Sequence, residues 1–254
     1  MNPYSFAIGV VTGLLVSTFG VFVINRRLAL AADAFSHVAL PGVAIALLLG
    51  FNSTLGALVT LFFGAIIIHT IQAKTKLFPE ILIGLVFSLS LAIGLLLVPT
   101  GDLESALLGD LGQLGPTDFA FGAIITLALL TIFIANFRRF TFTTFSETLA
   151  QVSGVKIERV NFMLLLGLVL AVALGIKVVG TLLVGSLLII PPAAAQLAAR
   201  NFRSLFAYAA LYGALSVTLG ILASTLAHLP PGPMVILFEG IFFLLSLALR
   251  GRSA

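Results

Sequence analysis

Residues 20–50 of the chain read GVFVINRRLALAADAFSHVALPGVAIALLLG, where the basic pair Arg26-Arg27 separates two long apolar runs. Five such clusters occupy every second gap between apolar runs and hold twelve of the 13 Lys and Arg residues, whereas Lys177 alone falls in the other set of gaps. Because cytoplasmic loops of membrane proteins are enriched in Lys and Arg, this pattern predicts a chain that crosses a bilayer repeatedly. The clusters are Arg26 and Arg27; Lys74 and Lys76; Arg138, Arg139, Lys156 and Arg159; Arg200 and Arg203; Arg250 and Arg252.

The composition agrees with a membrane protein, because 60% of the 254 residues are hydrophobic and 9% are charged, against about 25% charged in soluble domains. A span needs about 20 apolar residues. We expect an all-α, polytopic transmembrane bundle of eight or nine spans that forms one integral domain over residues 1–254, with the N-terminus outside and the C-terminus cytoplasmic. The candidate spans are 5–24, 30–50, 54–72, 81–98, 119–136, 160–176, 178–198, 204–227 and 231–249.

Several function classes are disfavoured by composition. The formal charge of +4 could suggest nucleic acid, but the basic residues follow the membrane topology, so no nucleic-acid partner is expected. The absence of Cys removes thiolate metal sites and cysteine nucleophiles. The chain also lacks a Gly-x-x-x-x-Gly-Lys-Ser/Thr phosphate loop, so energy for transport would come from a partner or a gradient.

Ionisable side chains inside a span are costly, and each is a functional hypothesis. In the second span Asp33 and His37 are four residues apart and share a helix face. Counted from Arg27 at 1.5 Å per residue, they lie about 9 Å and about 15 Å deep. Pro41 lacks the amide hydrogen that would bond the His37 carbonyl. Carboxylate, imidazole and carbonyl ligands suit Mn, Fe and Zn; the alternative is an Asp33–His37 hydrogen bond that ties helices together.

Proline and glycine predict breaks in two spans. Pro41-Gly42 follows the Asp33 and His37 pair, and Pro191-Pro192 lies in the middle of the seventh span. Broken helices mark transport sites in many carriers, although a purely architectural kink fits these residues equally well. We therefore assign Pro41, Gly42, Pro191 and Pro192 as candidate helix breaks and gating positions.

Other polar residues are less specific. His69 lies near the cytoplasmic end of the third span and is interpreted as interfacial, and His228 lies on an outside turn. Glu239 is buried in the last span without an obvious partner. The outside segment 99–118 holds four acids and no Lys or Arg, which fits either solvated loop acids or a mouth that concentrates cations.

The cytoplasmic segment 138–159 contains the sequence from Glu147 to Gly154, which predicts a short amphipathic helix ended by glycine. Leu149 and Val152 are three apart and share one face. Such a helix fits a docking surface for a partner or an ordinary helix at the lipid interface.

Together these segments resemble the permeases of ATP-binding-cassette (ABC) importers of the zinc, manganese and iron-chelate family, from about Gly20 to Leu249. The resemblance rests on Asn25-Arg26-Arg27 before Asp33-Ala34-Phe35-Ser36-His37-Val38-Ala39-Leu40-Pro41-Gly42, on Leu108-Gly109-Asp110-Leu111, and on Val179-Gly180-Thr181-Leu182-Leu183 with Ile189-Ile190-Pro191. Four departures are Ser146 in place of Asp, Ala32 in place of Gly, the second proline Pro192, and Glu239.

The resemblance implies a non-enzymatic, multi-pass permease of the inner (plasma) membrane that imports a divalent Mn, Zn or Fe ion and holds no permanent cofactor. It implies as partners a second permease copy, a cytoplasmic ATP-binding-cassette ATPase dimer, an extracytoplasmic metal-binding protein and the lipid bilayer. Asp33 and His37 carry over as the pore metal residues. Glu147, Ala150 and Gly154 carry over as ATPase-docking residues.

Three alternatives remain from the residues alone. A proton-coupled secondary metal carrier would use Asp33 and His37 as a relay, although no inverted repeat of the kind common in carriers is visible. A membrane-embedded enzyme is disfavoured because Ser36 and His37 are adjacent and point to different sides of a helix. An ATP-driven importer of larger cargo such as siderophores would need a wider cavity than two small ligands suggest.

Overall fold

The fold is a bundle of α-helices in a computed structural model that describes residues 3–75, 77–97, 116–180 and 184–250. Eight helices in this described part are long and apolar enough to cross a membrane, with α2 and α3 counted as one, and α10 is a shorter apolar helix. The prediction of an all-α polytopic bundle is confirmed. The helices are α1 (Pro3–Asn25), α2 (Ala29–Val38), α3 (Leu40–Leu49), α4 (Ser53–Thr75), α5 (Pro79–Leu97), α7 (Pro116–Phe145), α8 (Glu147–Val152), α9 (Ile157–Val179), α10 (Val184–Ala198), α11 (Phe202–Ala227) and α12 (Pro231–Arg250).

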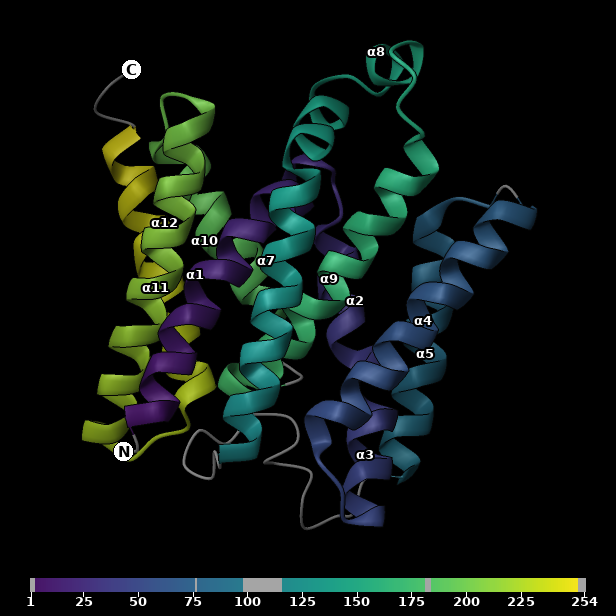
Figure 1. The fold of residues 1–254 in the computed structure, drawn as a ribbon. Helices are drawn as coiled ribbons and strands as arrows, with labels where there is room; N and C mark the ends of the chain where they lie inside the picture. The colour runs from purple at the N-terminus through teal and green to yellow at the C-terminus, as the bar shows by residue number, and fades with distance from the viewer. Residues whose placement is uncertain (1–2, 76, 98–115, 181–183, 251–254) are drawn as a thin grey trace.

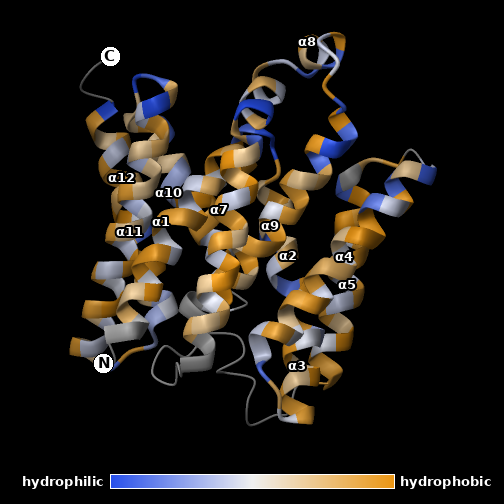
Figure 2. Ribbon diagram, in the orientation of Figure 1, coloured by the Kyte–Doolittle hydropathy of each residue, from blue (hydrophilic) through white to orange (hydrophobic). Residues whose placement is uncertain are grey.

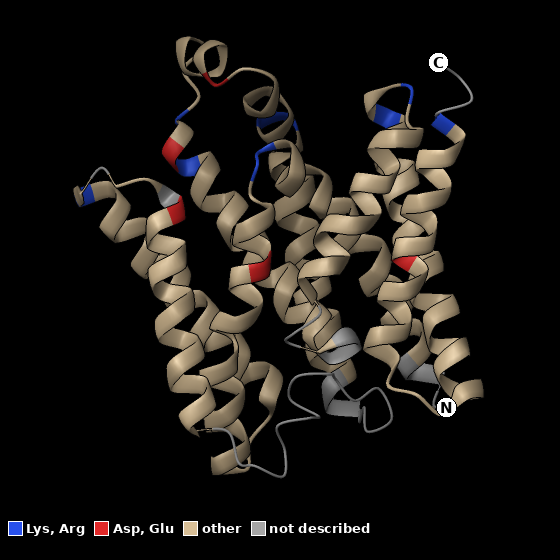
Figure 3. Ribbon diagram, turned by 180° about the vertical axis from the view of Figure 1, so that it is seen from behind, with Lys and Arg blue, Asp and Glu red and all other residues tan. Residues whose placement is uncertain are grey.

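The long helices run side by side, and α1 begins at the end of the bundle opposite to that where α12 finishes (Figure 1). Apolar residues dominate the middle of the helices, whereas hydrophilic residues gather towards the end that carries α8 (Figure 2). The Lys and Arg residues coloured in Figure 3 lie at this same end, whereas Lys177 is close to the other end of α9. The basic clusters thus share one end of the bundle, which is the end that the charge rule predicts to be cytoplasmic.

Helix α1 lies in the interior and packs against α7, α9, α10 and α11. Its buried Phe22 contacts Phe133, Phe137 and Phe140 of α7 and Phe206 of α11 at ring-centroid distances of 5.3–5.7 Å. Tilted and edge-on aromatic pairs of this kind add to the burial of apolar area. Small residues of α1 allow its other side to approach neighbouring backbones closely.

The predicted break at Pro191 and Pro192 is wrong, because α10 continues through both prolines. Each proline removes the amide that would bond the carbonyl four residues earlier, which leaves the carbonyls of Leu187 and Leu188 without a helical donor. The hydroxyl of Ser17 in α1 donates to the Leu187 carbonyl at 3.0 Å. Gly20 lies against the Leu188 carbonyl, since a Cβ built there would be 2.3 Å from that oxygen. A neighbouring helix therefore compensates for the prolines and keeps α10 helical.

The second span is interrupted at one residue near Pro41, because α2 ends at Val38 and α3 begins at Leu40. Pro41 occupies the first turn of α3, where a missing amide hydrogen is tolerated. The amide of Ala39 donates to the His37 carbonyl, so this carbonyl is not free for a cation as the sequence suggested. Gly42 lets α3 meet α4, since a Cβ on Gly42 would be 2.0 Å from the carbonyl oxygen of Gly56.

The sequence around Lys177 fits either two short helices or one long broken helix, and the structure has two helices, α9 up to Val179 and α10 from Val184. Gly180 at the end of α9 has a positive φ of 85°, a conformation that glycine adopts at little cost. The acidic segment 99–118 lies almost wholly outside the described residues, as do Leu108-Gly109-Asp110-Leu111 and Thr181-Leu182-Leu183.

The contact between α1 and α10 predicts an asymmetric response to alanine at two glycines. Gly20→Ala forces a Cβ onto the Leu188 carbonyl, whereas Gly240→Ala in α12 enters open space. Overpacking of this kind costs about 1–3 kcal/mol. We expect Gly20→Ala to lower the thermal transition of the detergent-solubilised protein by several degrees while Gly240→Ala leaves it unchanged. Equal transitions for the two variants would contradict the α1–α10 packing.

Candidate functional site

Asp33 and His37 lie one helical turn apart on α2, as the sequence predicts. The Asp33 side chain is exposed in the single chain and packs against α10, where a Cβ on Gly185 would be 2.9 Å from its carboxylate oxygen. The His37 ring is half-buried and meets Phe87 of α5 edge-on at a centroid distance of 5.3 Å. Asp33 thus contacts α10, and His37 contacts α5.

The two side chains are available to a ligand. No hydrogen bond joins Asp33 to His37 in the described part of the chain, and the buried Nδ1 of His37 makes none with any described residue. The Asp33–His37 hydrogen bond that was considered as an alternative to metal binding is therefore absent. No group of three His, Cys, Asp or Glu side chains suited to a metal ion occurs among the described residues. One chain offers a carboxylate and an imidazole, so further ligands would come from water or a second chain.

Helix α8 protrudes at the hydrophilic end of the bundle (Figures 1 and 2). Ser146 caps it by accepting a hydrogen bond from the Leu149 amide at 3.2 Å. The helix ends before Gly154, which has a positive φ of 80°. Leu149 and Val152 are 61% and 84% exposed, so they form an uncovered apolar face that we call the α8 face. The predicted short amphipathic helix is confirmed, and Ser146 performs the capping that an Asp would perform.

Ala150 differs from what a docking residue requires. Its side chain is fully buried, and its carbonyl accepts a hydrogen bond from the Val155 amide. Ala150 thus seats α8 on the rest of the chain, where a larger residue would not fit, and it offers no side-chain atoms to a partner.

Arg26 links four elements at the α1–α2 connection. Its guanidinium donates to the Thr143 carbonyl of α7 at 3.0 Å and to the Asn161 side chain of α9. It also forms an ion pair of 2.7 Å with Glu147 of α8, and its side chain is only 11% exposed. Burial lowers the pKa of Arg26, and the Glu147 carboxylate opposes this shift. The guanidinium stays charged because arginine keeps its proton even when it is partly buried.

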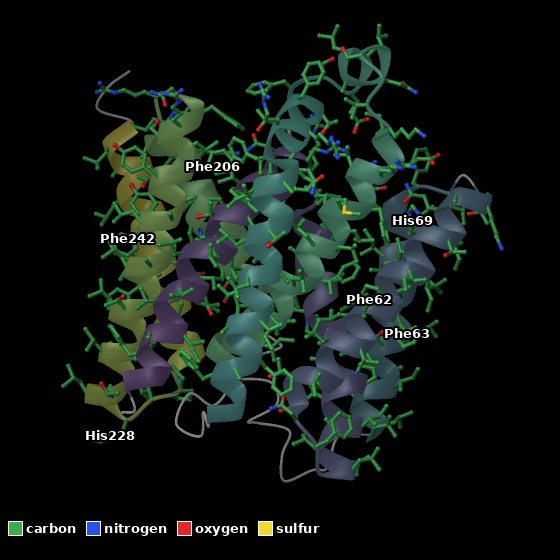
Figure 4. The ribbon with its side chains drawn as sticks, viewed as in Figure 1. Phe62, Phe63, His69, Phe206, His228 and Phe242 are labelled. Atoms are coloured by element: carbon green, nitrogen blue, oxygen red, sulfur yellow. The ribbon has the colours of Figure 1, made fainter. Side chains whose placement is uncertain are left out.

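The other polar residues singled out from the sequence, His69, His228 and Glu239, lie in separate parts of the structure. Figure 4 shows His69 towards the α8 end and His228 near the opposite end of the bundle. His228 ends α11 with a φ of 55°, which is a structural role. Glu239 is 1% exposed, and Ser186 of α10 is its polar neighbour. Sequence analysis could not pair Glu239 with Ser186, because the two residues are 53 positions apart in the chain.

Glu80 is a candidate that the sequence analysis missed. It follows Pro79 in the first turn of α5, where an acid is usual because it complements the helix dipole. The structure places it beside Asp33 in one cavity and beside His69 in another. No sequence signal separates this position from an ordinary first-turn acid.

Comparison with known proteins shows to which family of membrane proteins the chain belongs. Residues 4–250 match the ABC 3 transport family. The chain belongs to this family. It is 33% identical to the high-affinity zinc uptake system membrane protein ZnuB of Haemophilus influenzae, an alignment that covers 96% of this chain and 95% of ZnuB. It is 32% identical to the manganese import system permease protein ScaB of Streptococcus parasanguinis, over 94% of this chain and 86% of ScaB.

A solved structure supports the same conclusion. The chain matches a chain of PsaBC from Streptococcus pneumoniae, solved in complex with Fab, with a TM-score of 0.85 and 29% identity. The match covers 97% of this chain and 91% of that chain. The predicted family is confirmed: the protein is an ABC permease subunit of the inner membrane and not an enzyme, and ATP hydrolysis belongs to separate chains. The alternative interpretation of the protein as a proton-coupled secondary metal carrier is therefore not retained.

The Arg26 contacts predict that one substitution loosens α8. Arg26→Met removes the ion pair with Glu147 and both hydrogen bonds, so we expect the amides of residues 147–155 to exchange with deuterium faster, by about tenfold or more, because local opening becomes easier. Arg27→Met is the matched control, since Arg27 is exposed and makes no ion pair with a described residue. The measurement is hydrogen exchange followed by mass spectrometry, and equal exchange in both variants would exclude the link.

Proposed function

We propose that this chain is the membrane permease of an ATP-driven importer that carries a divalent transition-metal ion, manganese, zinc or iron, into the cytoplasm through a site formed by Asp33 and His37. The observation that carries the proposal is a carboxylate one turn from an imidazole on α2 whose Nδ1 makes no hydrogen bond with any described residue. Residues 1–254 act as one permease domain. The names of its relatives, which refer to zinc and manganese, support a metal cargo.

Ligand chemistry favours a borderline divalent ion over calcium or magnesium. Imidazole and carboxylate together suit Mn, Fe and Zn, whereas oxygen ligands alone suit the harder ions. The pair replaces part of the ion's hydration shell inside the membrane, where a bare dication would otherwise be strongly disfavoured. Two ligands per chain bind weakly enough for the ion to leave again, which conduction requires.

A second copy of the permease completes the site. Asp33 is exposed on a surface that also carries Leu30, which is 79% exposed. A charged side chain facing lipid tails near the bilayer centre costs about 2.5–3.5 kcal/mol or more. A partner permease that covers this surface removes that cost and supplies a second carboxylate and a second imidazole to the same ion.

The ATPase docks on the α8 face, and Arg26 transmits its movement. The exposed Leu149 and Val152 offer an apolar surface, while Glu147 joins α8 to Arg26 at the start of the α1–α2 connection. Asp33 lies seven residues after Arg26 on the next helix. A displacement of α8 by a cytoplasmic ATPase dimer is thus passed to the helix that holds the metal pair. The bend near Pro41 and Gly42 lets α2 move while α3 stays packed on α4.

The sides on which the metal ion is delivered and released follow from the orientation of the permease in the membrane. With the N-terminus outside and the α8 end cytoplasmic, an extracytoplasmic metal-binding protein presents the ion at the end opposite to α8. ATP binding and hydrolysis in the partner chains then alternate access to Asp33 and His37.

Loss of either metal ligand should abolish uptake without loss of the protein. In cells that express the permease with its ATPase, we expect Asp33→Ala and His37→Ala to lower radiolabelled manganese or zinc uptake at least tenfold, equivalent to about 1.4 kcal/mol. Ser36→Ala is the control on the same helix, because among the described residues its hydroxyl donates to the backbone carbonyl of Asp33 and to no side chain. Uptake at the wild-type rate in Asp33→Ala and His37→Ala, at equal membrane levels, would refute the pore role.

A charge on the α8 face should detach the ATPase. Val152→Glu places a carboxylate on this exposed apolar surface, and a desolvated, unpaired charge at an interface is strongly unfavourable. We expect the variant to lose most of the ATPase that co-purifies with the wild-type permease. Leu229→Glu is the matched control at the opposite end of the bundle, where Leu229 is 52% exposed. Retention of the ATPase by Val152→Glu would show that docking occurs elsewhere.

A further inference from the structure

A row of cavities connects Asp33 with the α8 end of the bundle. A cavity of about 270 Å³ lies between α2 and α5 and is lined by Asp33 and Glu80. A second cavity of about 270 Å³ shares Glu80 with the first and is also lined by His69 of α4 and by Asn161 of α9. A third, of about 350 Å³, shares His69 and reaches Glu158. The first two cavities thus share Glu80, and the second and third share His69, Gln72 and Asn161. Among these shared residues, Glu80 and His69 carry the carboxylate and the imidazole that suit a divalent transition metal.

The order of these residues follows the direction of transport. Phe87, which packs against His37, is seven residues after Glu80 on α5, so Glu80 lies about 10 Å nearer the α8 end. His69 is held by a ring contact with Phe162 of α9 at 4.5 Å. Figure 4 places His69 towards the α8 end. A cation released from Asp33 towards the α8 end therefore passes Glu80 and His69, which line the same cavity.

The net charge of the residues that line the three cavities has the opposite sign to the net charge of the protein. The three cavities together hold the four carboxylates of Asp33, Glu80, Glu147 and Glu158 and the two guanidinium groups of Arg26 and Arg27. With histidine neutral, the lining has a net charge of −2 in a protein of net charge +4. The Arg26 charge is already paired with Glu147, and neither Glu80 nor His69 has a hydrogen bond or ion pair with another described residue.

We infer that Glu80 and His69 form a cytoplasmic exit station, a weak second binding site for the transported divalent metal between the Asp33–His37 pair and the cytoplasm. This inference rests on the proposed function and extends it to the release step. A carboxylate and an imidazole repeat the ligand chemistry of the first site, so the ion exchanges one similar pair for another. The station holds the ion loosely, because a permeation pathway needs sites that bind and release in succession.

The binding test uses manganese(II) itself, titrated into the purified permease–ATPase complex and followed by electron paramagnetic resonance. The background is Asp33→Ala with His37→Ala, which removes the first site. We expect this background to retain a weak class of bound manganese, and the further changes Glu80→Gln and His69→Ala to weaken it at least tenfold. His228→Asn added to the same background is the control and leaves binding unchanged. Equal binding with and without Glu80 and His69 overturns the inference.

The transport test separates the station from the first site. We expect Glu80→Gln to lower manganese uptake about tenfold and Glu80→Asp to retain most of it, while ATP hydrolysis by the complex persists in both. Wild-type uptake in Glu80→Gln with His69→Ala, together with loss of uptake in Asp33→Ala, overturns the station and leaves the proposed function standing. Wild-type uptake in Asp33→Ala overturns both.

Discussion

The hydrogen bond from Ser17 to the Leu187 carbonyl illustrates the constraint on which the whole bundle depends, namely that a backbone carbonyl inside a membrane must be paired or covered by the protein itself. Lipid offers no donor to a carbonyl that proline has left unpaired, so another helix must supply one or cover it closely. Helix α1 does both, with Ser17 at Leu187 and Gly20 at Leu188. This requirement draws α1 into the interior, and the aromatic cluster around Phe22 then holds α7 and α11 on its other side.

The position of α10 in turn determines the metal pair. Gly185 lies about two turns before the prolines and contacts Asp33, while Phe87 of α5 contacts His37. The carboxylate and the imidazole are therefore held between two packed helices. They do not need a hydrogen bond to each other, which leaves both free for a cation. Asp33 and Glu80 line one cavity between α2 and α5, so the proposed first site and the proposed exit station share polar lining within an apolar bundle.

Arg26 connects this path with the part of the protein that meets the cytoplasm. One guanidinium reaches α7, α8 and α9 from the loop that leads into α2. Arginine suits this position because its planar group offers several donors in fixed directions and keeps its charge when buried. Helix α8 and the connection that leads into α2 are thus joined by a single side chain.

The sequence by itself determined the membrane topology class, because apolar length and the alternation of basic clusters follow directly from bilayer thickness and loop charge. It also placed Asp33 with His37, and Leu149 with Val152, because residues three or four apart on a helix share a face. Tertiary structure alone decided that α10 stays helical through Pro191 and Pro192, that Ala150 is buried, and that Glu80 meets His69 across a cavity. These depend on contacts between residues far apart in the chain, such as Ser17 with Leu187, and local periodicity carries no information about which helices become neighbours.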